Sequence, residues 1–191
     1  MITQRTRVYL MGMLVIAMLL SVHNSYASGL AGNRIGHGPG GGGGGGRLTQ
    51  AEIDGLMHMR EEEKLARDSY LTLYEKWHLP IFSNIASSEE THMTRIKDLL
   101  DRYGLPDPAA GNPAGVFTDP DLQQLYNDLM SQGSQSSTEA LKVGVTIEEV
   151  DIQDLGYYLA LTNKTDITQV YTNLRNASYN HLSAFNSQLG R

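Results

Sequence analysis

Two histidines follow a polar residue at a spacing of three: His92 follows Glu89, and His181 follows Ser178. Residues that are three apart lie on the same face of an α-helix. Imidazole and carboxylate groups are ligands that proteins offer to iron, manganese and zinc. The two pairs therefore predict a metal site, provided that the helices carrying them bury these faces.

Three further carboxylates fall within apolar stripes of helical period. Glu63 lies between Leu56 and Tyr70 on one stripe, and Glu148 and Asp151 lie three residues apart on another. An ionised carboxylate inside a helical bundle costs several kcal/mol unless it is compensated. Together with the glutamate of the first pair, these groups carry a charge of −4. Two divalent cations would balance that charge.

We expect a dinuclear centre without thiolate ligands, because the sequence has no cysteine. Inward-facing glutamates and Glu-x-x-His on bundle helices form the ligand pattern of di-iron carboxylate proteins. Iron is therefore the expected metal, with manganese or zinc as alternatives. For Asp151, a solvated or capping role is an equally open interpretation. The predicted ligands are Glu63, Glu89, His92, Glu148, Asp151 and His181.

Several other polar residues near these stripes are expected to have no role at the metal. Glu61, Glu62 and Glu149 are expected on solvated helix faces, because glutamate-rich faces are common in exposed helices. His58 and His78 fall outside the ligand stripe or within a turn. We therefore assign neither histidine to the site.

Capping signals mark the helices that must position these residues. Capping boxes of the S/T-x-x-E type start at Thr49 and Ser136, and Asp119 followed by proline starts a shorter helix. We predict helices over residues 49–77, 83–103, 119–133, 136–162 and 166–188.

The lengths of the connections predict the topology. Short turns join the first two long helices and the last two, so each pair is expected to form an antiparallel hairpin. The hairpins are separated by about 33 residues, far more than a local turn requires. We therefore predict an all-α fold, a ferritin-like four-helix bundle with one long crossover containing a short extra helix.

Side chains at one level of an antiparallel hairpin are equally far from its turn. The midpoint between Glu63 and Glu89 is position 76, beside the break that follows Trp77. The midpoint between Glu148 and Ser178 is position 163, inside the second turn. The polar residues of each hairpin are therefore expected to meet at one height of the bundle.

The N-terminus has the pattern of a secretory signal. Arg5 and Arg7 precede an apolar stretch over residues 8–20, and small residues stand at positions 25 and 27. The stretch is shorter than the roughly 20 residues of a membrane span. We predict a signal peptide over residues 1–27, a flexible Gly-rich linker over 28–47 and the bundle domain over 48–191. The expected location is periplasmic or extracellular, or at the membrane if the signal is not cleaved.

The charge distribution excludes several classes of function. The chain has 15 basic and 21 acidic residues, and four of the basic ones but none of the acidic ones precede Leu48. The predicted domain is therefore strongly acidic, which excludes nucleic acid as an expected partner. The absence of cysteine excludes disulfides, thiolate metal sites and cysteine nucleophiles.

Several motifs resemble those of known ferritin-like proteins. Residues 63–70 (EKLARDSY) resemble the first-helix signature of rubrerythrins, and residues 89–92 (EETH) resemble their second-helix signature. Over about residues 48–187, motifs that include GVFTDPDLQQLY and NASYNHLSAF more closely resemble a prokaryotic ferritin-like family of domains of unknown function, number 2202.

The resemblance implies a ligand set with one departure. Ser178 stands where a di-iron protein usually has its second glutamate, and Asp151 is the candidate replacement. Without that replacement the centre would be mononuclear, asymmetric or zinc-like. The cysteines that bring electrons to rubrerythrins are absent, so an external electron donor is expected. The ligands implied by the resemblance are Glu63, Glu89, His92, Glu148 and His181.

Three functions remain open at this point. The first is an iron or manganese enzyme of the oxidase, peroxidase or ferroxidase type, acting on oxygen or peroxide. The second is a non-catalytic module that binds or sequesters metal, and the third is a scaffold for a protein partner. A homodimer is compatible with each of them. No catalytic residue is assigned, although Tyr70, two turns from Glu63, is a candidate to hydrogen-bond a ligand or carry a radical.

Overall fold

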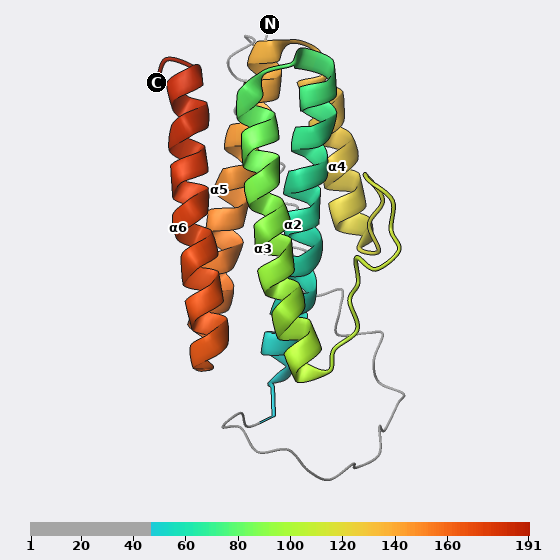
Figure 1. The fold of residues 1–191 in the computed structure, drawn as a ribbon, viewed down its shortest axis with the longest axis vertical. Helices are drawn as coiled ribbons and strands as arrows, with labels where there is room; N and C mark the ends of the chain where they lie inside the picture. The colour runs from blue at the N-terminus through green and yellow to red at the C-terminus, as the bar shows by residue number, and fades with distance from the viewer. Residues whose placement is uncertain (1–46) are drawn as a thin grey trace, which may run out of the picture. The chain divides into compact units, whose positions relative to one another are not determined.

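The computed structural model describes residues 47–191, which form five α-helices and contain no strand (Figure 1). The predicted all-α class is thereby confirmed. The predicted signal peptide and all of the predicted linker except Arg47 lie outside the described residues. The helices are α2 (Gln50–Trp77), α3 (Pro80–Tyr103), α4 (Pro120–Gly133), α5 (Ser137–Leu161) and α6 (Thr165–Gln188).

Most helix ends lie where the capping signals predict them. At the start of α2, the Thr49 hydroxyl accepts a hydrogen bond from the backbone N–H of Glu52, whose carboxylate accepts one from the N–H of Thr49. The prediction for α3 is wrong by one turn, since the helix begins at Pro80 rather than near residue 83. Proline has no N–H to satisfy and its φ suits the first helical position, so Pro80 begins the helix instead of ending the preceding turn.

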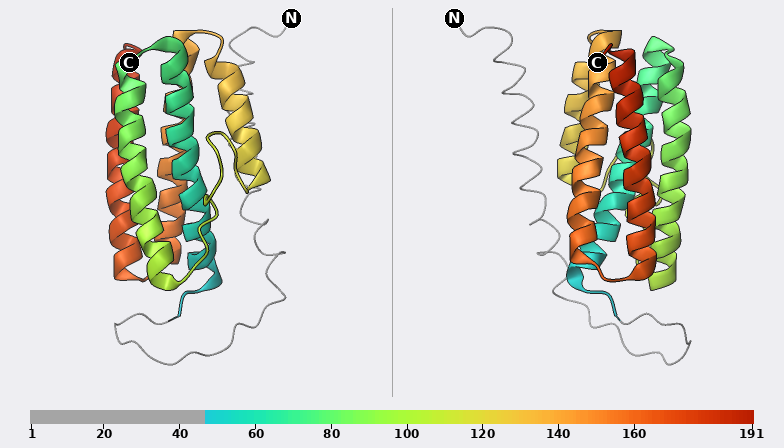
Figure 2. Two further views of the ribbon diagram at one scale, coloured as in Figure 1. Left: turned by 45° about the vertical axis from the view of Figure 1, so that its right-hand side comes forward. Right: turned by 90° about the vertical axis from the view of Figure 1, so that its left-hand side faces the viewer.

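The helix ends that meet define the topology. Tyr103, at the end of α3, donates a hydrogen bond of 2.9 Å to Asp166 in the first turn of α6. At the other end of the bundle, the indole N–H of Trp77 donates to the carbonyl of Gly133, where α4 ends, at 2.8 Å. The chain therefore traverses the bundle between α3 and α5, and these two helices run in the same direction (Figure 2). This is the predicted crossover with its extra helix.

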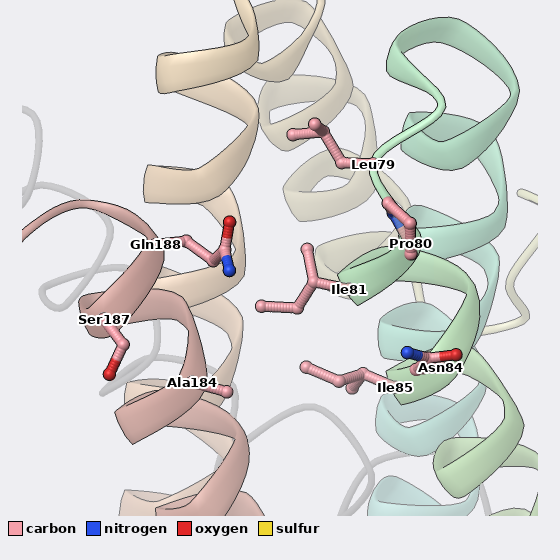
Figure 3. A pocket seen from close by; sticks show the side chains of 8 residues that line it. All are labelled: Leu79, Pro80, Ile81, Asn84, Ile85, Ala184, Ser187 and Gln188. Carbon is pink, nitrogen blue, oxygen red and sulfur yellow. The ribbon is translucent and has the colours of Figure 1, made fainter.

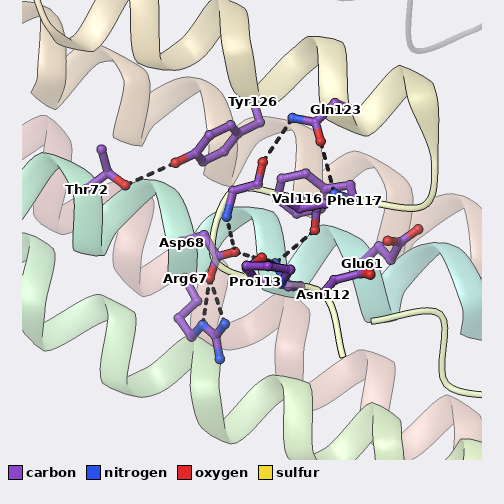
Figure 4. A network of polar contacts seen from close by, with 12 residues as sticks. Glu61, Arg67, Asp68, Thr72, Asn112, Pro113, Val116, Phe117, Gln123 and Tyr126 are labelled. Carbon is purple, nitrogen blue, oxygen red and sulfur yellow. Dashed lines mark hydrogen bonds and ion pairs between the residues drawn. The ribbon is translucent and has the colours of Figure 1, made fainter. Parts of the chain in front are cut away.

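The crossover is anchored to α2 by buried charges. Arg60 donates two hydrogen bonds of 3.0 Å to the carboxylate of Asp107. The ammonium group of Lys64, which is buried, donates to the carbonyls of Pro113 and Val116 at 2.8 and 3.1 Å. These contacts hold the loop along α2, and Figure 4 shows the part of the network around Asp68, Pro113 and Val116. One side of α2 that would otherwise face solvent is therefore covered.

Replacing Asp68 with alanine should destabilise the fold by about 3–5 kcal/mol, because it leaves a buried ammonium group without its counter-charge. Oδ2 of Asp68 lies 2.5 Å from Nζ of Lys64 and accepts a further hydrogen bond from the N–H of Gly115. Urea unfolding would measure the loss, with Asp98→Ala as the control because Asp98 is exposed. A loss below about 1 kcal/mol for Asp68→Ala would contradict this account of the crossover.

Two apolar clusters fill the interior on either side of a polar layer. One contains Leu73, Phe82 and Phe185 near the α2–α3 turn, and the other contains Leu56 and Leu155 near the opposite end. On all four long helices, the residues predicted to bind metal lie between the positions that belong to these clusters. The polar layer is therefore enclosed by apolar side chains. Among residues 47–191, none of the helices has the length and apolar character that crossing a bilayer requires.

Candidate metal centre

Glu89 lies between two histidines at the centre of the polar layer. Its Oε2 is 2.6 Å from Nδ1 of His92, and its Oε1 is 2.9 Å from Nδ1 of His181. The two imidazole rings are stacked, with their centroids 5.8 Å apart. Each oxygen of one carboxylate thus faces a different imidazole, as a carboxylate that bridges two metal ions would.

A second carboxylate lies beside each histidine. Oε2 of Glu63, from α2, is 3.2 Å from Nδ1 of His92. Oε2 of Glu148, from α5, is 3.4 Å from Nδ1 of His181. The side chains form two groups that share Glu89, and within each group one ligand atom of every residue lies within 4.8 Å of the others. The polar residues of each hairpin therefore meet at one height, as predicted.

Several polar atoms in these groups have no hydrogen-bond partner among the described residues. They are Oε1 of Glu63, Oε1 of Glu89 and Nδ1 of His181, all of them buried; the last two are 2.9 Å apart as an ion pair but are not aligned as a hydrogen bond. A buried polar atom without a partner costs about 1–3 kcal/mol. Each of these atoms belongs to a group of three possible metal ligands, so bound cations would satisfy them. The donor set, carboxylate oxygen and imidazole nitrogen, fits iron, manganese or zinc.

Without metal, protons balance the charges of this layer. Burial raises the pKa of Glu63 well above its ordinary value and that of Glu148 to about 7, with repulsion from Glu89 adding to the effect at Glu148. Burial alone would lower the pKa of His92 and His181, but their carboxylate neighbours raise it to about 11 and about 9. Burial would likewise raise the pKa of Glu89, but the two histidines lower it to about 2. In the metal-free chain, the two imidazolium ions thus supply positive charge that bound metal ions would otherwise provide.

Asp151 lies beside the two groups and belongs to neither of them. Its carboxyl group is hydrogen-bonded to the hydroxyl of Ser178, which also lies 2.9 Å from the carbonyl of Leu174. A hydroxyl has one hydrogen and can donate to only one of these acceptors. Burial, together with the charge of Glu148, raises the pKa of Asp151 to about 8. In the metal-free chain, protonated Asp151 can therefore donate to the Ser178 hydroxyl, while that hydroxyl donates to the carbonyl of Leu174. A ligand role for Asp151 stays a prediction.

Tyr70 contacts the site from a direction that the sequence did not indicate. Its hydroxyl donates a hydrogen bond of 2.6 Å to Oε1 of Glu148, a residue of the other hairpin. The sequence placed Tyr70 only relative to Glu63, two turns away on the same helix. Spacing along one helix does not reveal contacts across the bundle, so the contact with Glu148 was not predictable. Tyr70 is fully buried and holds the carboxylate of Glu148 in place.

Three residues outside the predicted ligand set are nevertheless buried. Glu61 and Glu62, predicted to be solvated, are buried, and so is His58. The carboxylate of Glu61 accepts hydrogen bonds from the backbone N–H groups of Thr118 and Asp119, at 2.6 and 3.0 Å. The predictions for Glu61 and Glu62 are wrong because the crossover covers Glu61, and because Glu62 faces α4 and α5. The prediction for Glu149 is confirmed, since it is exposed.

The histidines mark the side from which the centre is reached. The side chains of His92 and His181 are 8% and 13% exposed, whereas those of the neighbouring glutamates are at most 3% exposed. An apolar groove of about 560 Å³ runs between the start of α3 and the end of α6 (Figure 3). Its lining residues Ile85 and Ala184 lie one helical turn from Glu89 and His181, respectively. The groove therefore approaches the centre between these two helices.

The sequence that forms the bundle and its polar layer matches a known family. Residues 52–191 match the family described as an uncharacterized protein domain, DUF2202. The chain belongs to this family. The match includes α2 from residue 52 onward, all of α3 to α6 and every predicted ligand.

Relatives of this DUF2202 protein include a solved structure. The chain is 51% identical over 138 residues to the uncharacterized protein MJ0754 of Methanocaldococcus jannaschii, and the aligned region covers 72% of this chain and 75% of the relative. The crystal structure of that hypothetical protein has a TM-score of 0.76 at 48% identity, covering 78% of this chain and 86% of the other. A DUF305 fragment from Deinococcus radiodurans shares the fold, with a TM-score of 0.57 at 15% identity over 76% of this chain and 99% of the fragment.

In this DUF2202 domain, Tyr70→Phe should weaken metal binding by about 10–100-fold, the usual effect of removing a hydrogen bond that orients a ligand. The ring stays in the core, so only the contacts of the hydroxyl are lost: the 2.6 Å hydrogen bond to Glu148 and a longer one of 3.5 Å to the carbonyl of Gly144. Competition with a chromophoric chelator would measure the affinity. Tyr179→Phe is the matched control, because Tyr179 is exposed on α6. Equal affinities for the two variants would show that Tyr70 does not orient Glu148.

Proposed function

We propose that this protein is a metal-binding bundle with a dinuclear iron or manganese carboxylate centre, and that the centre has oxidase, peroxidase or ferroxidase-type activity. The observation that carries the proposal is the position of Glu89, whose two oxygens each face the Nδ1 atom of a different histidine. A single carboxylate shared by two ligand groups is suited to hold two ions side by side.

The charges of the layer support two divalent ions. Glu63, Glu89 and Glu148 contribute −3 when ionised, and Asp151 contributes one further negative charge. Two divalent cations would balance these four charges with both histidines neutral. Burying that much negative charge without cations would be costly, because each ion loses its hydration. The expected ligands are Glu63, Glu89 and His92 for one ion, and Glu89, Glu148 and His181 for the other.

Bound iron or manganese would supply one-electron redox changes to a small oxidant such as oxygen or peroxide. The chain's own residues would do the rest. The apolar clusters on both sides limit access by water, and a small molecule would approach along the groove between α3 and α6, whose lining reaches to one helical turn from Glu89 and His181. Asp151 can hold or release a proton beside the centre near neutral pH. Electrons would come from an external donor, because the sequence has no cysteine to hold a second redox centre.

A second function, metal binding without catalysis, is favoured by Ser178. The hydroxyl of Ser178 engages Asp151, so neither residue belongs to the two ligand groups. One assay separates the two functions: the protein is loaded with Fe²⁺ and mixed with peroxide, and oxidation is followed over several equivalents. Repeated turnover with a reductant present would support the enzyme. Stoichiometric metal binding without turnover would leave the sequestering module.

We also propose that the protein is exported, on the strength of the N-terminal pattern described above. Protein recovered from outside the cytoplasm should then begin at Ser28. N-terminal sequencing of protein from separated cell fractions would measure this. Recovery from the cytoplasm with residues 1–27 intact would contradict export.

A further inference from the structure

A separate His-carboxylate cluster lies between α2 and α5, away from Glu89. His58 and Glu62 are one turn apart on α2, and Asp154 comes from α5. Nε2 of His58 is 3.2 Å from Oδ2 of Asp154 and 3.7 Å from Oε2 of Glu62. The three residues are 1%, 3% and 3% exposed, and one ligand atom of each lies within 4.8 Å of the others. The cluster shares no residue with the two groups around Glu89.

The separations in this cluster match those of metal ligands. Zinc binds imidazole nitrogen and carboxylate oxygen at about 2.0–2.2 Å in tetrahedral sites, so ligand atoms stand about 3.4 Å apart around the ion. The distances of 3.2 and 3.7 Å from Nε2 of His58 lie on either side of that value. A direct N–H···O hydrogen bond is usually shorter, at about 2.9–3.0 Å.

Glu62 provides an independent observation. Both of its carboxylate oxygens are buried and have no hydrogen-bond partner among residues 47–191. The carboxylates of Asp154, Asp151 and Glu63 repel it when they are ionised. His58 can carry one positive charge, which is too little for two carboxylates. A divalent cation would balance both Glu62 and Asp154.

A metal-free arrangement explains only part of this cluster. A hydrogen bond between His58 and Asp154 satisfies one contact, but it leaves both oxygens of Glu62 without a donor. Glu62 also lines a small cavity between α2, α4 and α5, whose other lining residues include Asp151 and Leu129. The cavity has a volume of about 10 Å³, which is just enough for one water molecule beside Glu62.

We propose that His58, Glu62 and Asp154 bind one divalent cation of the zinc type, in a structural site distinct from the dinuclear centre. The site would join the two hairpins, because α2 belongs to one and α5 to the other. Since no ligand is shared, this proposal stands or falls separately from the function proposed above.

The test starts from a full-chain variant that lacks the main centre, Glu89→Ala/His92→Ala/His181→Ala. This variant should still bind one Zn²⁺ per chain, and Co²⁺ should give visible absorption bands that indicate imidazole ligation. Adding Asp154→Asn, which preserves shape and a hydrogen-bonding oxygen, should weaken binding of both ions by at least 100-fold. The matched control adds Asp98→Asn instead, at an exposed position of α3, and should leave binding unchanged.

Glu62→Gln in the same background provides a second variant if Asp154→Asn does not fold. It removes the charge of the residue that lacks partners, and the bound ion should again be lost. The proposal is overturned if the main-centre variant binds no Zn²⁺, or if a folded Asp154→Asn or Glu62→Gln variant binds it as tightly as the Asp98→Asn control. Wild-type protein that binds only one ion, lost with Asp154→Asn, would support this site and refute the dinuclear centre.

Discussion

Replacing Glu89 and His92 with alanine should remove two metal ions per chain. Glu89 belongs to both ligand groups, and its loss leaves each group one oxygen short. His92 is the only imidazole in the group that contains Glu63. Mutating a residue that only hydrogen-bonds to a metal ligand lowers metal affinity by about 10–100-fold, so removing two direct ligands should weaken binding by more than about 100-fold. Elemental analysis of protein purified without added metal would count the ions.

The same variant should lose the stabilisation that metal gives. A ligand present at 100 times its Kd stabilises the native state by about 2.7 kcal/mol, so chelation should lower the Tm of the wild-type protein and leave that of the variant much less changed. Glu90→Ala is the matched control, since Glu90 is the exposed neighbour of Glu89. It should keep the wild-type metal content. Equal metal content in the variant and this control would refute the centre.

The stability of the metal-free protein should fall as the pH rises from about 5 to 9. Asp151 and Glu148 have pKa values of about 8 and about 7 in the folded chain, above their ordinary values of 3.8 and 4.5. His92 and His181 are raised from 6.5 to about 11 and about 9. In this range the folded chain holds protons that the unfolded chain releases, so raising the pH favours unfolding. Glu89, whose pKa is lowered to about 2, acts in the opposite direction but only below its ordinary pKa of 4.5.

Metal should reverse this dependence, because its ligands must be deprotonated to bind. The difference in Tm between metal-loaded and chelated protein should therefore be small at pH 5 and grow towards pH 9. Circular dichroism melts at pH 5, 7 and 9, with and without chelator, would measure it. One pKa unit corresponds to about 1.36 kcal/mol, so Asp151 alone should lower the free energy of unfolding of the chelated protein by several kcal/mol between pH 5 and 9. A chelated protein that becomes more stable between pH 5 and 9 would contradict the assignment of these groups.

The helix boundaries, and the level of the bundle at which the polar residues of each hairpin meet, were predictable because local signals determine them. Capping residues such as Thr49 and Asp119 act within one turn, and the structure places the helix starts beside both. The meeting of Glu63 with Glu89 followed from their equal distance to one turn. The start of α3 at Pro80 was missed because proline is compatible both with ending a helix and with the first position of the next one.

The surroundings of α2 were not predictable from period alone. A helical stripe predicts one buried face, but α2 also contacts the crossover and α4 on its other sides. Lys64 and Glu61 are buried there by a loop whose path no sequence period specifies, and Glu62 is buried facing α4 and α5. A signal was nevertheless present, since His58 and Glu62 lie one turn apart on α2. The partner Asp154 comes from the other hairpin and became apparent only in the fold.

Anomalous scattering from crystals grown with Fe²⁺ or Mn²⁺ tests the central claim most directly. Two peaks should flank Glu89, one beside Nδ1 of His92 and the other beside Nδ1 of His181. Data collected on both sides of the metal absorption edge would identify the element at each peak. If the crystals grow from a solution that contains the metal at millimolar concentration, the absence of any peak beside Glu89 would contradict the dinuclear centre.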